Sequence, residues 1–313
     1  MALLTLNEVG VFAALSAGPA SAEALAETLG CDHRALTLLL NAGVSLELLE
    51  ATDAGVANAA DVAAFLVPGV PAYLGGALKY AYDVFPAWAG LARGVRTGEP
   101  QLAEEDYLGG DAERTERFVR AMHGRALGAG RGIAQAVDLS GCSALLDVGG
   151  GSGAYSILLC QRQPELRATV CDLDGIVAIS ALLVAEAGLS DRVATHAWDL
   201  RSDPLPAGHD AALVSGVLHR LSPTDARALV GRVRDALQPG GQVFLADVML
   251  DDTGAGPPSA ALFGVNMLLT APGGGAHRAA DHVEWLTDAS FETPEILTLP
   301  PPALHTVVRA RRA

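Results

Sequence analysis

A glycine-rich segment near the middle of the chain restricts the possible folds more than any other feature. The stretch LLDVGGGSGAYSILL (145–159) holds an apolar run ending at Asp147, four glycines within five positions, and a second apolar run. Open α/β sheets bind ligands at a turn of this kind, because bare backbone N–H groups can approach the ligand closely. The segment therefore predicts a strand, a ligand-binding turn at its carboxyl end, and a following helix.

From residue 144 onward, apolar runs of strand length alternate with helical patterns. We expect strands at 144–149, 167–173, 192–199, 209–218, 241–250 and 303–312. We expect helices at about 153–163, 175–188, 222–238, 258–270 and 279–290. Strands separated by helices form parallel sheets, so the predicted class is α/β with a doubly wound, Rossmann-like sheet.

The N-terminal part has a different pattern, in which short helices precede a hairpin. Ser21 and Asp32 are placed to cap two successive helices, and LELLEATDAGVANA (46–59) is suited to a small wing. A winged helix that read DNA would carry a basic second helix, but this one offers only His33 and Arg34. We therefore expect a winged-helix-like oligomerisation module.

These patterns divide the chain into three parts. We expect a winged-helix-like dimerisation domain in residues 1–85, and a helical linker and pocket roof with one long helix at 111–137 in residues 86–138. We expect residues 139–313 to form the cofactor-binding catalytic domain.

The charge and composition exclude several classes of partner. The chain has 21 basic and 36 acidic residues, for a net charge of −15, which opposes nucleic acid or an anionic membrane as the main partner. It has neither a basic signal-type N-terminus nor an apolar run of about 20 residues, so we expect a cytoplasmic protein. The four cysteines lack C-x-x-C spacing and are expected to be reduced thiols. A single lysine, Lys79, among abundant Arg and Ala indicates a bacterial gene of high GC content.

Two kinds of cofactor suit the glycine-rich turn. Gly149-x-Gly151-x-x-Ala154 with Asp172 downstream satisfies the loose dinucleotide pattern, which predicts an NAD-dependent oxidoreductase. However, Asp147 would repel a phosphate and suits a cationic group such as an ammonium. Asp199, at the end of a later strand, is placed to accept a hydrogen bond from an adenine amino group. These two acidic residues favour a different nucleotide-like cofactor, one with an adenine and a cationic group. The dinucleotide remains as an alternative.

Several further motifs carry a family resemblance. The stretches DVGGGSG, VCDLDGI, AWDL, SGVLHRLSPTDARALVGRVRDALQPGGQVFLADVML and APGGGAHRAADHVEWL span much of the second half of the chain. Together with the N-terminal pattern, they resemble the S-adenosylmethionine-dependent O-methyltransferases of the plant caffeate type and their bacterial natural-product relatives. The resemblance implies a class I methyltransferase fold, S-adenosyl-L-methionine as cofactor, S-adenosyl-L-homocysteine as product, and a homodimer.

The same resemblance implies the cofactor contacts. Three glycines, an acidic residue before them and residues at three later strand ends would hold the cofactor: Asp147, Gly149, Gly151, Gly153, Asp172, Leu173, Asp199, Leu200 and Ser215. Asp172 would take the ribose hydroxyls, and Asp199 would take the adenine amino group with Leu200 packed on the ring. Ser215 stands where relatives often carry Lys or Arg.

The resemblance also implies the catalytic residues. His219 in VLH matches the family's general base, and Asp247 matches the first of two acidic residues that orient it. His277 stands where the second acidic residue, a Glu, is expected, and Arg220-Leu221 replace the usual Asp-Trp. These departures leave open a member that binds the cofactor but performs C-methylation, N-methylation or non-methylating chemistry.

The acceptor contacts are expected from two helical segments. Asn266 and Met267 match positions that touch the acceptor in relatives, while Met122, His123 and Tyr107 would roof the pocket. The histidines lack metal-ligand spacing, so no metal is implied. The expected activity is O-methylation of a hydroxylated aromatic small molecule in bacterial secondary metabolism.

Overall fold

The computed structural model describes residues 1–70, 73–102, 112–299 and 304–313. Its contacts divide the chain into two compact units, Met1–Pro86 and Ala87–Ala313. The predicted acceptor contact Tyr107 lies outside the described residues.

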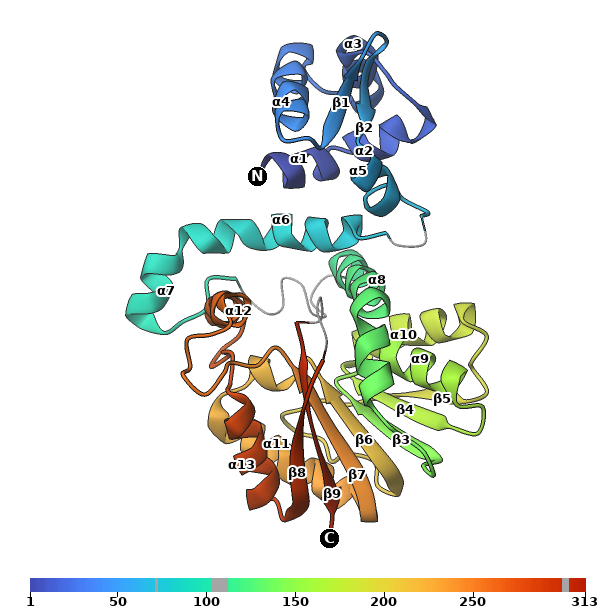
Figure 1. The fold of residues 1–313 in the computed structure, drawn as a ribbon, viewed down its shortest axis with the longest axis vertical. Coiled ribbons are helices and arrows are strands. Elements are labelled where there is room, and N and C mark those ends of the chain that lie inside the picture. The colour runs from blue at the N-terminus through green and yellow to red at the C-terminus, as the bar shows by residue number, and fades with distance from the viewer. Residues whose placement is uncertain (71–72, 103–111, 300–303) are drawn as a thin grey trace. The chain divides into compact units, whose positions relative to one another are not determined.

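The first unit is a small helical bundle with a two-stranded wing (Figure 1). Its elements are α1 (Ala2–Glu8), α2 (Val11–Ala14), η1 (Leu15–Ala17), α3 (Ala22–Leu29), α4 (His33–Ser45), β1 (Leu49–Thr52), β2 (Gly55–Asn58) and α5 (Ala60–Phe65). Ser21 Oγ accepts the Ala24 N–H at 3.2 Å, and Asp32 Oδ1 accepts the Ala35 N–H at 2.8 Å. Both predicted helix caps and the predicted wing are therefore present.

Further helices follow α5 among the described residues. They are α6 (Gly75–Ala89), α7 (Leu91–Thr97) and α8 (Ala112–Ala136). The long helix expected at 111–137 is confirmed as α8, although residue 111 lies outside the described part of the chain.

The second unit is built on a seven-stranded sheet of order β5-β4-β3-β6-β7-β9-β8. Its strands are β3 (Ala144–Val148), β4 (Arg167–Asp172), β5 (Val193–Ala197), β6 (His209–Ser215), β7 (Leu237–Asp247), β8 (Phe291–Thr298) and β9 (Thr306–Arg312). β3 through β7 are parallel. The strand order reverses beside β3, so the carboxyl end of β3 is the position where doubly wound sheets open a ligand crevice.

The sheet differs from the expected one at one edge. β9 pairs antiparallel with both β7 and β8, so the sheet is mixed and not wholly parallel. The strand β8 was not predicted, because Pro294 and two glutamates interrupt its apolar pattern. The predicted strand at 241–250 begins earlier, at Leu237, and ends at Asp247.

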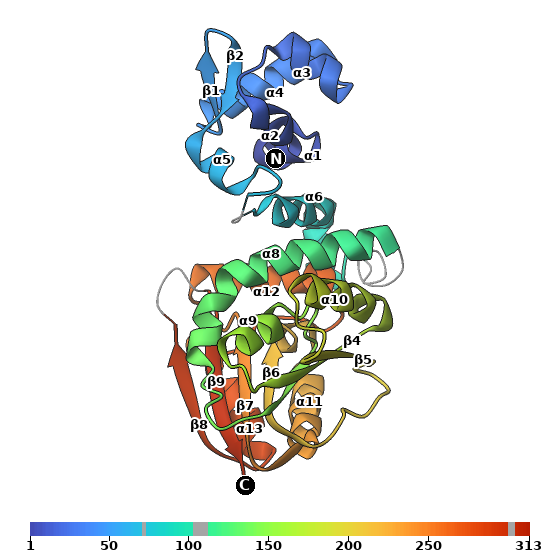
Figure 2. The same ribbon diagram turned by 90° about the vertical axis from the view of Figure 1, so that its right-hand side faces the viewer.

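Helices cover both faces of the sheet. α8, α9 (Ala154–Arg162) and α10 (Asp174–Glu186) lie on one face, and α11 (Pro223–Ala236) and α13 (Ala279–Asp288) lie on the other (Figures 1 and 2). Alternate strand residues feed two cores: Leu145 packs with the α8 and α9 side, and its neighbour Leu146 with the α11 and α13 side. The remaining helix, α12 (Pro258–Thr270), follows β7. None of the described helices is both long and apolar enough to cross a membrane.

Candidate functional site

The glycine-rich turn follows β3 in a backbone conformation that favours glycine. Gly149, Gly151 and Gly153 have φ angles of 64°, 54° and 72°. A Cβ on Gly149 would lie 2.3 Å from Val217 Cγ2, so the glycine allows the turn to pack closely against the segment that follows β6. A Cβ on Gly151 would meet no atom within 4 Å. Gly149 is therefore required by packing, whereas Gly151 faces open space.

Asp147 lies beneath this turn and is fully buried. Its Oδ2 accepts the Ser156 hydroxyl at 2.6 Å, while its Oδ1 has no hydrogen-bond partner. A Cβ on Gly150 would lie 2.7 Å from the Asp147 carboxyl carbon, so the turn rests directly on this side chain. Burial raises the pKa of Asp147 to about 6.

Asp172, at the end of β4, is tied to the same turn. Its two carboxylate oxygens accept the Gly151 and Leu173 N–H groups, each at 2.8 Å. Burial raises the pKa of Asp172, against the lowering effect of these two N–H groups. The Leu173 side chain packs with a small core between α8 and α10 that includes Val119. The structure thus brings the predicted residues Asp147, Gly151 and Asp172 together.

His123 on α8 contacts the turn as well. Its Nδ1 is hydrogen-bonded to Ser152 Oγ at 3.0 Å, and Ser152 is buried. Burial lowers the pKa of His123. This contact places His123 against the glycine-rich turn, whereas the sequence suggests an acceptor contact for it. Ser152 was not among the predicted site residues, although its place between two glycines was a signal.

The remaining predicted cofactor residues lie at the ends of β5 and β6. The Asp199 carboxylate accepts the Arg201 N–H at 2.8 Å and so caps its own turn. Leu200 is half-buried and packs against the core on the α11 side. Ser215 is the last residue of β6 and is half-buried.

His219 and Asp247 form a hydrogen-bonded pair where β6 and β7 end. His219 lies in the one-turn helix η3 (Leu218–Arg220), and Asp247 is the last residue of β7. His219 Nδ1 lies 2.6 Å from Asp247 Oδ1, and the His219 backbone N–H donates to Oδ2 at 3.2 Å. Burial raises the pKa of Asp247, but the His219 charge and hydrogen bond outweigh it and lower the pKa to about 2. Because an ionised carboxylate only accepts, His219 Nδ1 carries the hydrogen of this contact, and Nε2 is the ring nitrogen that Asp247 does not engage.

Phe263 on α12 supports the same imidazole. Its ring meets the His219 ring edge-on, with centroids 4.7 Å apart and an interplanar angle of 80°. The His219 side chain is 14% exposed, so it reaches solvent or a ligand over a small area. Sequence reasoning missed Phe263, although it lies three residues before the predicted acceptor contact Asn266.

The predicted acceptor residues are placed by α8 and α12. Asn266 is half-buried on α12, one helical turn after Phe263, and Met122 is half-buried on α8. Met267 is buried, with 3% of its surface exposed, which favours a packing role.

His277 does not contact the His219 ring through its nitrogens. Its Nε2 lies 3.1 Å from the carbonyl oxygens of both Leu218 and Leu221. The predicted catalytic set is therefore divided: Asp247 holds the His219 imidazole, and His277 holds the main chain on either side of it.

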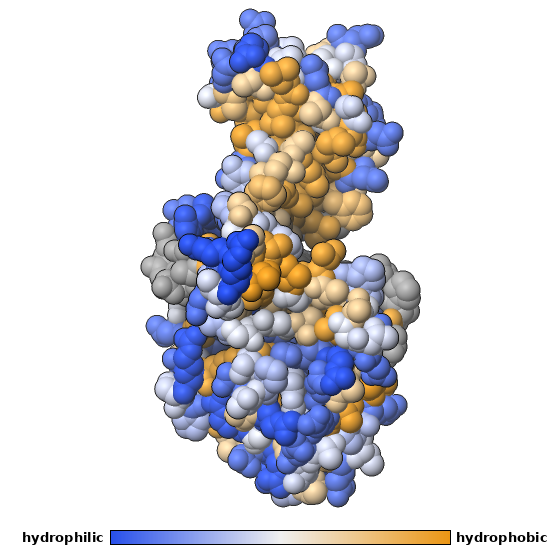
Figure 3. Space-filling model, turned by 90° about the vertical axis from the view of Figure 1, so that its left-hand side faces the viewer, coloured by the Kyte–Doolittle hydropathy of each residue, from blue (hydrophilic) through white to orange (hydrophobic). Residues whose placement is uncertain are grey.

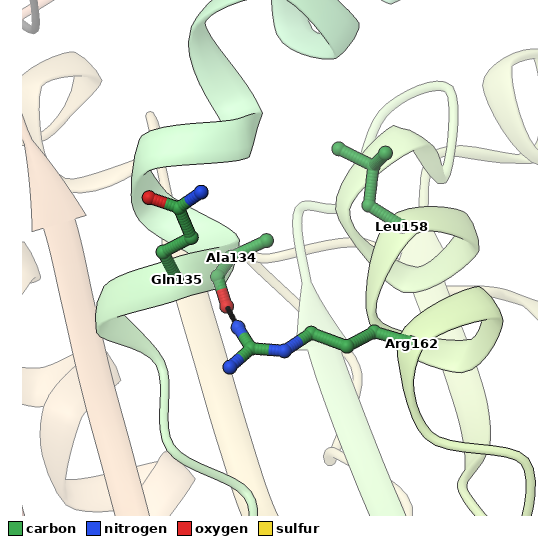
Figure 4. A pocket seen from close by; sticks show the side chains of 4 residues that line it. All are labelled: Ala134, Gln135, Leu158 and Arg162. Carbon is green, nitrogen blue, oxygen red and sulfur yellow. Dashed lines mark hydrogen bonds between the residues drawn. The ribbon is translucent and has the colours of Figure 1, made fainter.

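A shallow pocket of about 420 Å³ lies away from these residues, between α8 and α9. It is lined by Ala134, Gln135, Leu158 and Arg162, and the Arg162 guanidinium donates to the Ala134 carbonyl (Figure 4). It contains none of the predicted site residues.

Comparisons with known proteins identify the family. Residues 88–292 match the O-methyltransferase domain family, and residues 1–69 match the O-methyltransferase dimerisation domain. The chain belongs to the O-methyltransferase family. It is thus an S-adenosylmethionine-dependent methyltransferase with a class I fold, and the oxidoreductase alternative is set aside.

Individual relatives extend this match along the chain. The 3-hydroxy-5-methyl-1-naphthoate 3-O-methyltransferase of Streptomyces sahachiroi is 36% identical over 310 residues, which cover 98% of this chain and 90% of the relative. The N,N-dimethyltransferase OxyT of Streptomyces rimosus is 33% identical over 260 residues, covering 80% and 75%. The structure of human N-acetylserotonin methyltransferase with S-adenosylmethionine aligns with a TM-score of 0.90 at 25% identity, covering 100% and 93%.

The residues around the glycine-rich turn fit S-adenosylmethionine. The position beside Gly151 is open where a Cβ would otherwise stand, so a ligand can approach the backbone there. The unpartnered Oδ1 of buried Asp147 is an acceptor that suits an ammonium group. Asp172, an acidic residue, is the last residue of the adjacent strand β4.

Proposed function

We propose that this O-methyltransferase methylates a phenolic hydroxyl of a hydroxylated aromatic small molecule in bacterial secondary metabolism, with His219 as general base. The observation that carries the proposal is the 2.6 Å contact between His219 Nδ1 and Asp247 Oδ1, which leaves Nε2 as a proton acceptor. S-adenosylmethionine, when bound, supplies a methyl group on a positively charged sulfur that a nucleophilic oxygen can displace.

The glycine-rich turn and its acidic neighbours form the proposed cofactor site. In this proposal Gly149, Gly151 and Gly153 shape the floor under the methionine part. Asp147 then balances the ammonium charge, and Asp172 accepts from the ribose hydroxyls.

The adenine end of the cofactor lies, in this proposal, at the exits of β5 and β6. The Asp199 carboxylate takes the adenine amino group, and Leu200 packs on the ring. Ser215 offers a short hydroxyl at the end of β6.

The proton on the acceptor is the chemical problem that His219 solves. A phenol with a pKa near 10 is about three units from its anion at pH 7, which corresponds to roughly 4 kcal/mol. His219 Nε2 takes this proton while Asp247 stabilises the resulting imidazolium and keeps the ring orientation. Phe263 restricts rotation of the same ring.

The relatives and the lining residues support the proposed acceptor class. The relative from Streptomyces sahachiroi is named for a hydroxynaphthoate acceptor, whereas OxyT is named for N-methylation. A hydrogen-bonded His–Asp pair favours an oxygen acceptor, because a phenol must be deprotonated before it attacks and a neutral amine need not be. Asn266, Met122 and the Phe263 edge are the proposed lining on the acceptor side.

The proposed function is tested by incubating the protein with S-adenosylmethionine and 3-hydroxy-5-methyl-1-naphthoate and following the product by mass spectrometry. We expect a mass gain of one methyl group on oxygen, and His219→Ala is expected to lower kcat on the order of 100-fold or more. Binding of S-adenosylhomocysteine by the variant is the control for an intact cofactor site. Unchanged turnover in His219→Ala would remove the base role, and methylation on a ring carbon would overturn the assignment of a phenolic oxygen as acceptor.

We further propose that the protein is a cytoplasmic homodimer assembled through residues 1–85. The match to a dimerisation domain and the free state of all four cysteines support this proposal. Residues 86–138 are proposed as the linker and pocket roof, and residues 139–313 as the catalytic part.

A further inference from the structure

The turn that carries His219 is held from outside by the segment before α13. The His277 ring nitrogen Nε2 lies 3.1 Å from Leu218 O and 3.1 Å from Leu221 O, the carbonyls on either side of His219. The Leu221 N–H also donates to Leu218 O at 3.1 Å, which closes the turn. The His277 imidazole therefore contacts the carbonyl of the first residue of η3 and the carbonyl of the residue that follows η3.

A second contact from the same segment reaches His219 itself. The Gly275 N–H donates to the His219 carbonyl at 2.9 Å, and a Cβ on Gly274 would lie 3.0 Å from that carbonyl oxygen. The segment before α13 thus fixes the main chain around His219 at three carbonyl groups, those of residues 218, 219 and 221.

His277 is itself anchored beside the exit of β7. The Leu250 N–H donates to the His277 carbonyl at 2.9 Å, and Leu250 follows Asp247 by three residues. The His277 ring packs edge-on against Trp285, with centroids 5.0 Å apart, and is 9% exposed. His277 therefore connects the strand exit that carries Asp247 with the turn that carries His219.

The partners of His277 determine its tautomer. Carbonyl oxygens only accept hydrogen bonds, so Nε2 must carry hydrogen. A carboxylate at this position would place acceptor oxygens against two carbonyl oxygens, which is unfavourable. The histidine is thus suited to this turn in a way that a glutamate is not.

We propose that His277 is a positioning residue, which aligns the His219–Asp247 pair by donating from Nε2 to Leu218 O and Leu221 O. This inference rests on the proposed base role of His219. It assigns to His277 an action on the main chain, in place of the direct hold on the imidazole that the resemblance implies.

The first test needs no acceptor and therefore stands apart from the proposed function. Protein labelled with ¹⁵N-histidine is examined by long-range ¹H–¹⁵N NMR, which distinguishes the two neutral imidazole tautomers. We expect His277 as the Nε2–H tautomer and His219 as the Nδ1–H tautomer. A neutral Nδ1–H tautomer at His277 overturns the proposal, whether or not any acceptor is methylated.

The second test compares three substitutions of His277. In His277→Gln, the amide nitrogen replaces Nε2 as donor, whereas His277→Ala removes the donor and His277→Glu substitutes acceptors. We expect kcat to fall on the order of tenfold or more in the Ala and Glu variants, and the Gln variant to restore most of that loss. Affinity for S-adenosylhomocysteine and the melting temperature show whether each variant is folded.

The pattern of rescue decides the outcome. A Glu variant as active as the wild type, beside an inactive Gln variant, would show that an acid acting on His219 is what this position requires. The His219 resonances supply a second readout: they should keep their wild-type positions in His277→Gln and shift in His277→Glu. His196→Gln, on the edge strand β5, is the matched control, which leaves the His219 resonances in place.

Discussion

At the scale of single residues, burial disfavours the ionised form of the Asp147 carboxyl. Its carboxyl is fully buried, one oxygen lacks a partner, and burial raises its pKa to about 6. A raised acid pKa means that the folded protein binds this proton more tightly than the unfolded chain does. Without cofactor, stability is therefore lost as pH rises from about 4 through 6, by roughly 3 kcal/mol at most.

A cationic ligand group should reverse this effect. We predict that S-adenosylhomocysteine binding at pH 6 releases protons, because the ligand's ammonium favours the ionised form of Asp147. Calorimetry in buffers of different ionisation enthalpy measures the release, and affinity should rise between pH 5 and 7. Asp147→Asn is the control, in which the buffer dependence should disappear. A buffer-independent enthalpy in the wild type would contradict the proposed ammonium contact.

At the scale of elements, the turn between β3 and α9 holds two glycines with different surroundings. Gly149 and Gly151 share a left-handed backbone, but only Gly149 has a neighbour where its Cβ would be. The two positions should therefore respond differently to the same substitution.

We predict that Gly149→Ala destabilises the protein strongly, because its Cβ would overlap Val217. Gly151→Ala should cost only about 1–2 kcal/mol in stability but weaken S-adenosylhomocysteine binding on the order of tenfold or more. Gly188→Ala is the matched control, since Gly188 has a φ of 69°, no atom within 4 Å of the position that a Cβ would take, and no part in the site. Thermal unfolding and calorimetry measure the two effects. Undiminished cofactor affinity in Gly151→Ala would show that this side of the turn does not face the ligand.

At the scale of the whole molecule, the first unit leaves apolar surface uncovered. Figure 3 shows apolar side chains gathered over one face of this unit. Its exposed large apolar side chains include Leu38 and Leu46, which are 59% and 58% exposed. Surface of this kind in a unit that matches a dimerisation domain is expected to be buried by a second copy.

We predict a solution mass of twice the 32.1 kDa chain. The double substitution Leu38→Glu with Leu46→Glu should shift this mass toward the monomer, as measured by light scattering after size exclusion. Leu182→Glu is the matched control, because Leu182 is 54% exposed but lies in the second unit. A wild-type protein that is monomeric and methylates at full rate would contradict the proposed homodimer.

Local sequence patterns determined most of the elements of this protein. The Ser21 and Asp32 caps, the wing, α8 and the strand–turn–helix around Gly151 follow from spacing and residue type, because caps and glycine turns depend on a few adjacent residues. The pairing of β8 with β9 was not predictable in this way, since an antiparallel edge strand depends on its neighbour more than on its own pattern.

The sequence by itself also predicted where the proposed site lies, because strands that end at one edge of a parallel sheet bring their following residues together. Their partners were decided only by tertiary structure. His123 contacts Ser152, Phe263 meets the His219 ring, and His277 donates to two carbonyls, and each contact joins segments 29 or more residues apart. The spacing of residues in the sequence does not give the distance between segments that lie so far apart in the chain. Whether a histidine contacts a side chain or a backbone turn is therefore decided by packing.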